Sequence, residues 1–512
     1  MSVPPLFYRR HTQVNKPITA SILYNLVQCP HRVSMDLFGD PALRDPINPF
    51  VQLLWEKGNA FEQEVIEGLD LPFTNLHTYY GDEKERFTTE AMERGDNLIY
   101  SGRISVDDLV GEPDILRRCD DGYIAGDIKS GAGEEGGSED IDGKPKKHYA
   151  VQLALYTDIL ERLRISGGRS PFVWDVHGEE VEYILDAPQG SRNPASLWDV
   201  YQSALETARQ LVAHAKDTLP ALGSTCKLCH WYTACTKRLE KLDDLTLIPE
   251  LGRVRRDNML MHVDSVRDLA KANLETLING KKTIIPRIGV DMLIKFQKRA
   301  RLQKQPGARP YLKEPISLPS ADLELFFDIE TDPMRDICYL HGFVERHGGD
   351  TDTERYIAFL AEDPTPEEEE RAFVEAWKYV QDSQPCAIYY YSHYERTIWR
   401  KLQKKYSAVA TEEEIEAMFD PATAVDLYSH VVRSKTEWPT RDYSIKTLAS
   451  YLGFKWRDSN PSGAASIEWY HRWVESGDTE IRQRILNYNE DDCVAMRVLL
   501  DGIKELGIIG GS

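Results

Sequence analysis

Residues 323–331 read LELFFDIET, and this stretch decides how we expect the last third of the chain to fold. Its apolar residues have the length and composition of a strand, and Asp328 and Glu330 stand two positions apart within it. Side chains alternate along a strand, so both carboxylates should face the same side. Paired carboxylates of this kind hold divalent cations. The stretch therefore predicts a strand that binds metal.

The sequence after this strand alternates between strand and helix patterns. ICYLHGFV (337–344), RYIAFLA (355–361) and CAIYYYS (386–392) are typical of strands, and TPEEEERAFVEAW (365–377) is typical of a helix. Helical patterns follow. Strands succeeded by alternating helices indicate an α/β domain.

The segment ILNYNEDDCVAM (485–496) places Tyr488 four residues before Asp492. Together with the Asp-x-Glu strand, it resembles the tyrosine-type DEDD exonucleases, which have an RNase H-like fold and a two-metal site. The resemblance implies that Asp328, Glu330 and Asp492 hold metal. It also implies that Tyr488 orients the attacking water.

The second motif of that family departs from the usual pattern. The family supplies another aspartate after a later strand, whereas AIYYYSHYERTIW (387–399) offers Glu395 there. We take Glu395 as the replacement and as a metal ligand. Asp426, in TAVDLYSH (423–430), is a secondary candidate.

A second acidic constellation lies in the N-terminal half. Asp114 is in EPDIL (112–116), and Asp127 and Lys129 are in GDIKS (126–130), on successive expected strands. Alternation puts Asp127 and Lys129 on one face. Their carboxylates would hold the cation that phosphodiester hydrolysis needs, and the lysine would stabilise charge on the phosphate or orient the water.

This arrangement resembles the RecB-like branch of the PD-(D/E)xK nucleases. That branch also carries Gln-x-x-x-Tyr on the next helix, and HYAVQLALY (148–156) contains Gln152 and Tyr156. Relatives usually have a histidine ligand on the preceding helix, where WEKGNAFEQEV (55–65) has Glu62. Glu62 is either the substitute ligand or an ordinary surface residue of that helix.

Eight cysteines occur, and three crowd together in STCKLCHWYTACTKR (224–238), as Cys226, Cys229 and Cys235. Such crowding favours a metal site over disulfides. A fourth, Cys29, is in TASILYNLVQCPHRVSMDLF (19–38), which predicts one capped helix. The set resembles the iron–sulfur nucleases of the RecB family, which implies that these four cysteines bind a 4Fe–4S cluster with a structural role. Zinc, with His230 as an optional ligand, is the competing interpretation.

Composition bounds the class of protein. The chain has 512 residues, enough for about three domains, with 41% hydrophobic and 28% charged residues. We find no apolar run of membrane-spanning length and no signal peptide, so we expect a cytoplasmic protein. A net charge of −21 argues against a protein that coats nucleic acid. The basic run 295–313 is either a solvated linker or a nucleic-acid contact.

We therefore expect an α/β multidomain protein with three parts. They are a restriction-endonuclease-like domain with the iron–sulfur cluster (1–240), a helical connector with a faint helix-hairpin-helix resemblance (241–318), and an RNase H-like exonuclease domain (319–512). The whole resembles bacterial and archaeal RecB-like putative nucleases fused to an RNase H-like domain.

The resemblance implies a nuclease that uses Mg²⁺ or Mn²⁺ and acts on nucleic acid, with single-stranded or end-bearing DNA as the expected substrate. Repair and defence against invading DNA are roles suggested by analogy alone. Two other classes stay open. One is an end-binding adaptor in which one or both sites are inactive, and the other is a redox sensor that works through the cluster.

Overall fold

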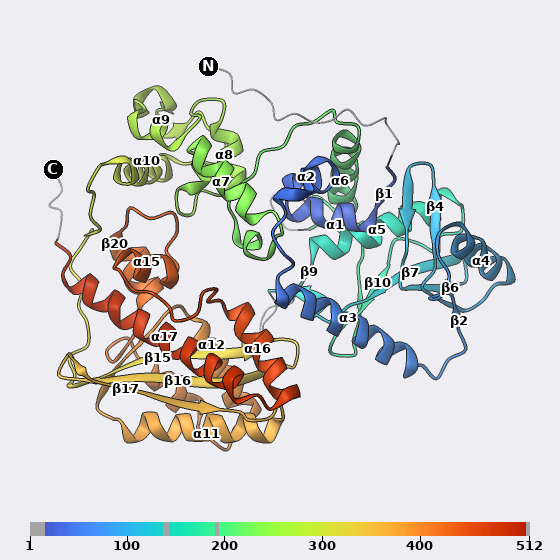
Figure 1. The fold of residues 1–512 in the computed structure, drawn as a ribbon. Coiled ribbons are helices and arrows are strands. Elements are labelled where there is room, and N and C mark those ends of the chain that lie inside the picture. Colours follow the sequence, from blue (N-terminus) through green and yellow to red (C-terminus); the bar gives the residue numbers. More distant parts are fainter. Residues whose placement is uncertain (1–15, 137–142, 190–193, 508–512) are drawn as a thin grey trace. The chain divides into compact units, whose positions relative to one another are not determined.

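A computed structural model describes residues 16–136, 143–189 and 194–507. The chain divides into two compact units, Met1–Pro220 with Ser224–Cys235, and Ala221–Gly223 with Thr236–Ser512 (Figure 1). The predicted connector falls in the second unit. Its separate domain status stays a prediction.

The first unit is built on a six-stranded mixed sheet in the order β11-β10-β7-β6-β3-β2. A three-stranded sheet in the order β1-β5-β4 accompanies it. The two strands expected around Asp114 and Asp127 form as β6 and β7, which are an antiparallel pair. The strands are β1 (Ile18–Thr19), β2 (Thr74–Asn75), β3 (Leu98–Tyr100), β4 (Ile104–Val106), β5 (Leu109–Gly111), β6 (Ile115–Cys119), β7 (Gly122–Ile128), β8 (Glu134–Glu135), β9 (Lys144–Pro145), β10 (Phe172–Trp174) and β11 (Glu180–Glu182).

The helices of this unit enclose its core. Helix α5 is buried along most of its length, and its apolar residues share one cluster with those of α1 and α6. The helices are α1 (Ala20–Gln28), α2 (Pro30–Phe38), α3 (Pro49–Glu67), α4 (Gly81–Arg94), α5 (Lys147–Arg162) and α6 (Leu197–Val212). Helix α7 (Tyr232–Leu242) begins in this unit and ends in the next.

The single helix predicted over residues 19–38 is wrong. Two helices form instead, and Cys29 lies between them in an extended conformation, with φ −159° and ψ 104°. The cause is Pro30, which lacks a backbone N–H and disfavours helical geometry in the residue before it. Proline then serves as the first residue of α2, where no N–H is needed. The break places the half-buried Cys29 at the junction between α1 and α2.

The second unit begins with small helices that share one apolar cluster. They are α8 (Gly252–Met259), α9 (Val266–Lys271) and α10 (Val290–Lys304), with a short hairpin of β12 (Ile278–Asn279) and β13 (Lys282–Thr283). Another two-stranded pair joins β14 (Tyr311–Leu312) to β20 (Thr436–Glu437). Most of the basic run therefore lies on α10.

A five-stranded sheet in the order β17-β16-β15-β18-β19 forms the centre of the second unit. The two pairs β15–β16 and β16–β17 are antiparallel, whereas β15–β18 and β18–β19 are parallel. Its strands are β15 (Leu323–Asp332), β16 (Ile337–His347), β17 (Asp350–Leu360), β18 (Cys386–Tyr390) and β19 (Ala424–Asp426). The predicted strands of this region are confirmed.

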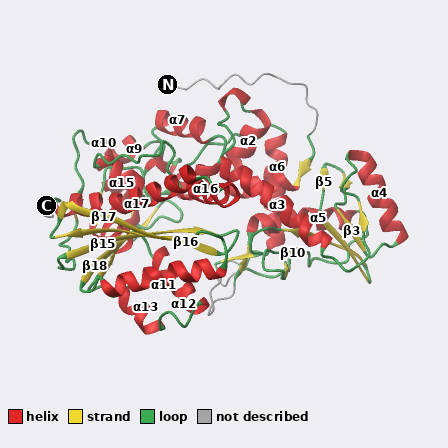
Figure 2. Cartoon of the chain, turned by 60° about the horizontal axis from the view of Figure 1, so that its bottom comes forward, coloured by secondary structure: helices red, strands yellow, loops and turns green. Residues whose placement is uncertain are grey.

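Helices cover both faces of this sheet (Figure 2). Phe327 and Ile329 of β15 pack on α11 and α12, whereas Phe326 packs on the opposite face with α17. Asp328 and Glu330 share the α17 face with Phe326 because strand side chains alternate. The helices are α11 (Pro366–Asp382), α12 (Tyr394–Lys405), α13 (Glu412–Met418), α14 (Arg433–Lys435), α15 (Ile445–Tyr451), α16 (Gly463–Ser476) and α17 (Thr479–Lys504), with a π-helical turn at Leu427–Val432.

Candidate active sites

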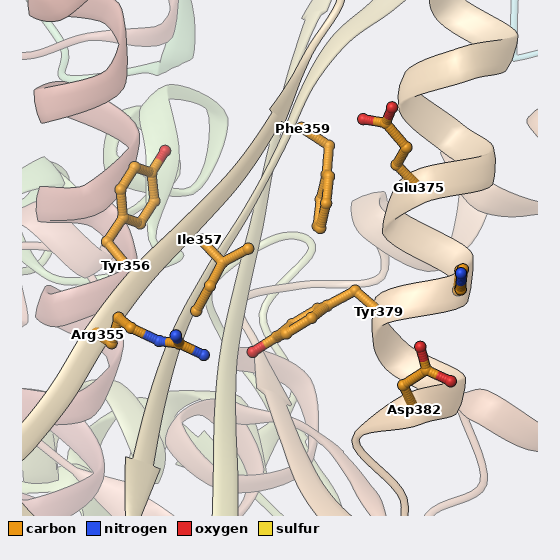
Figure 3. A pocket seen from close by; sticks show the side chains of 8 residues that line it. Arg355, Tyr356, Ile357, Phe359, Glu375, Tyr379 and Asp382 are labelled. Carbon is orange, nitrogen blue, oxygen red and sulfur yellow. The ribbon is translucent and has the colours of Figure 1, made fainter.

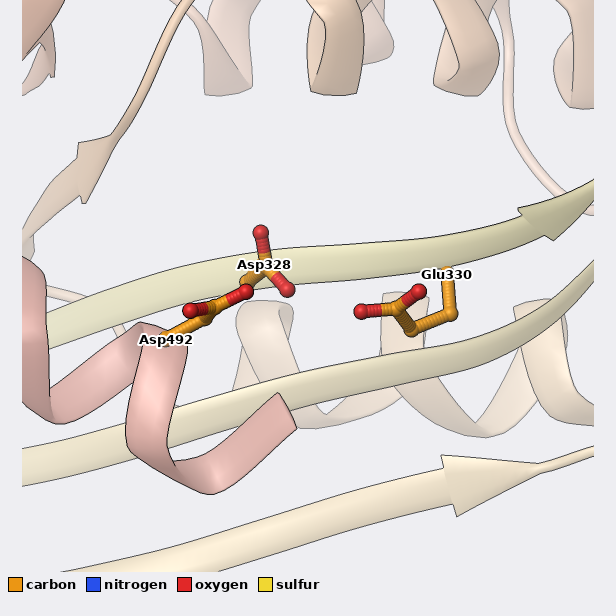
Figure 4. Close-up of side chains that lie close together, drawn as sticks. All are labelled: Asp328, Glu330 and Asp492. Atoms are coloured by element: carbon orange, nitrogen blue, oxygen red, sulfur yellow. The ribbon is translucent and has the colours of Figure 1, made fainter. Parts of the chain in front are cut away.

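The carboxylates predicted on β15 meet a third from α17. Asp328, Glu330 and Asp492 each offer an oxygen, and these three oxygens lie within 4.8 Å of one another (Figure 4). Within the described ranges, no other group of three or more carboxylate, histidine or cysteine ligand atoms is this compact. Strand and helix thus converge on one acidic centre.

Asn489 fixes the orientation of Asp328. Its Nδ2 donates to Asp328 Oδ2 at 2.7 Å, and its Oδ1 accepts from the Tyr356 hydroxyl at 2.8 Å. This close approach requires glycine on the neighbouring strand, opposite Asp328. A Cβ added to Gly342 would lie 1.6 Å from Asn489 Oδ1.

Asp492 is held by two donors from elsewhere in the unit. Trp456 Nε1 donates to Asp492 Oδ1 at 2.7 Å, and Lys446 Nζ lies 3.3 Å from both carboxylate oxygens. Lys446 Nζ also donates to the Tyr488 hydroxyl at 2.9 Å. Tyr488 and Asp492 share one face of α17 because they are four residues apart. The predicted pair therefore lies together beside the acidic centre.

Glu395 approaches the same centre from the first turn of α12. It is 4% exposed, and its Oε2 is buried without a hydrogen-bond partner among the described residues. Its charge acts on Asp328. Asp426 instead holds the backbone in place, since its Oδ1 accepts hydrogen bonds from the backbone N–H groups of Ser392 and Ser429. Of these two residues, Glu395 is thus the more suitable candidate for a fourth ligand.

Burial and mutual repulsion make the ionised carboxylates of the acidic centre unfavourable. Burial, followed by the charge of Asp492, raises the pKa of Asp328 well above its usual value. The same two causes raise the pKa of Glu330 to about 8, and burial raises that of Glu395 to about 8. A bound divalent cation would relieve this repulsion. The donor set is all oxygen, which suits Mg²⁺ or Mn²⁺.

These raised pKa values predict how stability depends on pH. Without divalent cations, the free energy of unfolding should fall as pH rises from about 4, where unfolded carboxyls ionise, to about 8, where the folded ones do. The folded state binds more protons across that interval, so rising pH favours the unfolded state. Mg²⁺ should restore stability most at the alkaline end.

Thermal unfolding in EDTA and in Mg²⁺ across that pH interval measures this effect. The double variant Asp328→Asn, Glu395→Gln should show a shallower pH slope in EDTA. A wild-type melting temperature that does not change with pH in EDTA would contradict the prediction.

The second acidic site lies on β7 and at the start of β6. Lys129 Nζ is 2.8 Å from Asp127 Oδ2 and 3.9 Å from Asp114 Oδ2. Asp114 Oδ2 also accepts from the backbone N–H of Ile128 at 2.8 Å. Burial, then the charge of Asp127, raises the pKa of Asp114 to about 8. The structure therefore brings the predicted Asp-Asp-Lys set together around one ammonium.

Glu62 of α3 is hydrogen-bonded to Tyr100, which lies next to this site. The Tyr100 hydroxyl donates to Glu62 Oε1 at 2.8 Å, and the His77 ring stacks on Tyr100 with centroids 5.7 Å apart. The charge of Glu62 adds to that of Asp127 in raising the pKa of Asp114. Glu62 is thus a neighbour of Asp114.

Gln152 and Tyr156 lie on the buried helix α5. Gln152 Oε1 is buried without a hydrogen-bond partner among the described residues. Tyr156 is 3% exposed, and burial, then the charges of Asp127 and Asp114, raises its pKa well above the usual value. Tyr156 therefore lies near the two aspartates of the second site. Gln152 stands four residues before it, on the same face of α5.

The four cysteines of the predicted cluster lie near the two ends of the first unit's sequence, at positions 29, 226, 229 and 235. Cys29 is at the α1–α2 junction, and the charges of Cys29 and Cys226 both act on the Cys229 thiol. Burial is the main cause that raises the pKa of Cys229. Among the described residues, no three of the cysteines bring their sulfurs within 4.8 Å of one another.

Asp36 of α2 ties the two cysteine segments together. Its Oδ1 hydrogen-bonds to His230 Nε2 at 2.7 Å and accepts from Trp231 Nε1 at 2.8 Å. His230 thus has a structural partner on its Nε2. This contact holds the segment after α6 against the segment that follows Cys29.

A separate pocket of about 510 Å³ lies between β17 and α11, on the other face of the five-stranded sheet. Arg355, Phe359, Tyr379 and Asp382 contribute to its lining (Figure 3). None of the predicted site residues lines it. The pocket is therefore not the candidate active site.

Several residues at these sites were missed by sequence reasoning. They are Tyr100, Lys446, Trp456 and Asn489. Each contact joins segments well separated in the chain, so no local spacing signals it. Only Asn489 had a cue, because it adjoins Tyr488 in the late motif.

The sheet order, the helices on both faces and the acidic centre define an RNase H-like α/β domain within a larger multidomain chain. The family model described as the RNase_H superfamily matches residues 325–503. This supports the RNase H-like part of the prediction. A comparison of the sequence with curated proteins finds no match. Among the helices described, none is both long and apolar enough to cross a membrane.

Proposed function

We propose that this chain is a metal-dependent nuclease that hydrolyses phosphodiester bonds, with single-stranded or end-bearing DNA as its substrate. The gathering of Asp328, Glu330 and Asp492 on an RNase H-like domain is the observation that carries the proposal. Glu395 completes the ligand set, and its buried Oε2, without a hydrogen-bond partner among residues 16–136, 143–189 and 194–507, supports that role.

Bound Mg²⁺ or Mn²⁺ would polarise the phosphate and lower the pKa of the attacking water. The chain itself supplies orientation. Burial, then the charges of Asp492 and Glu330, keeps the pKa of Tyr488 well above its usual value, so its hydroxyl stays protonated. Tyr488 therefore orients the water by hydrogen bonding and does not take its proton.

The test is digestion of end-labelled single-stranded and duplex DNA and matched RNA, with Mg²⁺ and with EDTA. An exonuclease releases mononucleotides from one end only, and only with the cation. Tight binding of DNA ends without hydrolysis in Mg²⁺ or Mn²⁺ would favour an end-binding adaptor instead.

A second nuclease site of the PD-(D/E)xK type in the first unit is part of the proposal. Asp114, Asp127 and Glu62 are its proposed metal ligands. The Lys129 ammonium lies beside Asp114 and Asp127, so it would also lie beside a phosphate bound to the metal ion. There it would stabilise the negative charge on the phosphate. Gln152 and Tyr156 would line this site, and the buried Gln152 Oε1, which has no hydrogen-bond partner in the described part of the chain, supports a polar contact there.

We further propose that Cys29, Cys226, Cys229 and Cys235 bind a 4Fe–4S cluster with a structural role. Thiolates are the usual ligands of such clusters. The electrostatic effect of Cys29 and of Cys226 on the Cys229 thiol supports the proximity of each to Cys229. The cluster would join the two cysteine segments of the first unit and reduce the entropy of the unfolded chain.

Cys229→Ser is expected to remove the cluster and to lower the melting temperature of the first unit. Anaerobic purification, the visible absorption of the protein, and its iron and sulfide content measure this. The matched control is Cys119→Ser in the same unit, because Cys119 lies outside the four-cysteine set and its thiol donates to the Gly122 carbonyl. Zinc in place of iron in the wild-type protein would contradict the iron–sulfur proposal.

A further inference from the structure

Lys446 contacts both Tyr488 and Asp492 through its ammonium group. It lies in the first turn of α15, which is capped by Ser444 through the N–H of Thr447. Its ammonium also lies over two aromatic rings, 4.7 Å from the centroid of Tyr488 and 5.4 Å from that of Trp456. Cap and rings hold the ammonium in place.

The geometry puts this ammonium where a divalent cation would also bind. Asp492 Oδ1 already accepts from Trp456, and Lys446 Nζ is equidistant, at 3.3 Å, from both Asp492 oxygens. A metal ion that uses Asp492 must share these oxygens with the ammonium or displace it. Lysine carries a compact charge on a flexible stem, so such an exchange needs no backbone movement.

The charges of the site point the same way. Asp328 and Glu330 both have raised pKa values, and the charge of Lys446 opposes this increase for each. For Glu330, hydrogen bonds from Ser466 and Tyr339 oppose it as well. The lysine therefore offsets part of the repulsion among the carboxylates before any metal binds. Its side chain is 28% exposed, which leaves a route toward solvent.

We propose that Lys446 is the resident counter-cation of this carboxylate cluster and a positioning residue for Tyr488. In the metal-free protein the Lys446 ammonium contacts the Asp492 carboxylate. When a divalent cation binds Asp492, the ammonium moves away from that carboxylate. It keeps its hydrogen bond to the Tyr488 hydroxyl. The effect on Tyr488 rests on the proposed nuclease function. The competition with the metal ion does not.

Mn²⁺ binding to the full chain, measured by titration calorimetry at fixed pH and salt, tests the competition. Lys446→Met should bind Mn²⁺ roughly tenfold more tightly, because the competing charge beside Asp492 is gone. Lys446→Arg keeps the charge and should bind as the wild type does. The matched control is Lys455→Met, which removes the same charge from an exposed position nearby and should leave the affinity unchanged.

Turnover provides the second readout. At saturating Mn²⁺, Lys446→Met should lower kcat roughly tenfold or more with little change in KM, because Tyr488 loses its donor and substrate contacts remain. Lys446→Arg should recover part of kcat. Tighter metal binding combined with lower kcat is a result that simple loss of folding cannot produce.

Unchanged or weaker Mn²⁺ binding by Lys446→Met would overturn the counter-cation proposal, and so would the same change in Lys455→Met. Unchanged kcat in Lys446→Met would overturn the role in positioning Tyr488. If the wild type binds Mn²⁺ but hydrolyses no nucleic acid, the nuclease proposal fails. The Mn²⁺ affinities of the wild type and Lys446→Met would then still show whether Lys446 competes with the metal ion for Asp492.

Discussion

Asp328→Asn is expected to lower cation-dependent hydrolysis by the RNase H-like domain on the order of 10³-fold, or about 4 kcal/mol of transition-state stabilisation. The substitution keeps the shape of the side chain and an oxygen that can accept from Asn489 Nδ2. It removes a negative charge from the centre of three clustered carboxylates. The loss should therefore fall on metal binding and catalysis and leave the fold intact.

Stability separates this effect from misfolding. Burial and the charge of Asp492 already disfavour ionised Asp328, so its neutral replacement should unfold at a higher temperature than the wild type in EDTA. The control is Asp352→Asn, which removes the same charge from an exposed position on β17. If Asp328→Asn hydrolyses the substrate with Mg²⁺ at the wild-type rate, Asp328 has no part in catalysis.

The acidic strand is the part of the site that the sequence predicts best. Period-two alternation places Asp328 and Glu330 on one face of β15, and four-residue spacing places Tyr488 and Asp492 on one face of α17. Both patterns are local and depend only on backbone geometry. The ladder remains regular from Leu323 to Glu330, with its irregularity only at Glu330/Thr331. The strand therefore delivers both carboxylates to the same place.

Contacts between distant segments were not predictable in the same way. Lys446 and Trp456 reach Asp492 across 46 and 36 residues, and Tyr100 reaches Glu62 across 38. Packing sets these distances, and no periodic pattern records packing. The helix break at Cys29 was predictable in principle, because Pro30 stands in the sequence. The helical spacing of apolar residues on either side obscured it.

Asp127→Asn is expected to abolish the second nuclease activity, with a loss also on the order of 10³-fold. Asp127 is 1% exposed and lies 2.8 Å from the Lys129 ammonium. The variant would therefore lose a proposed metal ligand and the nearer of the two carboxylates that face the half-buried Lys129 ammonium. Some loss of stability in the first unit is expected with it, since a partly buried charge would lose its nearest counter-charge.

The decisive measurement compares Asp127→Asn, Asp328→Asn and the double variant on the same labelled substrates. If both sites are catalytic, each single variant loses a different set of products, and only the double variant is inactive. Asp120→Asn, at an exposed position in the β6–β7 turn, is the matched control and should behave as the wild type does. An Asp127→Asn protein that gives every wild-type product at the wild-type rate would leave the first unit without a catalytic role. Asp114, Asp127 and Lys129 would then belong to a binding module, in which they bind nucleic acid or stabilise the fold without hydrolysis.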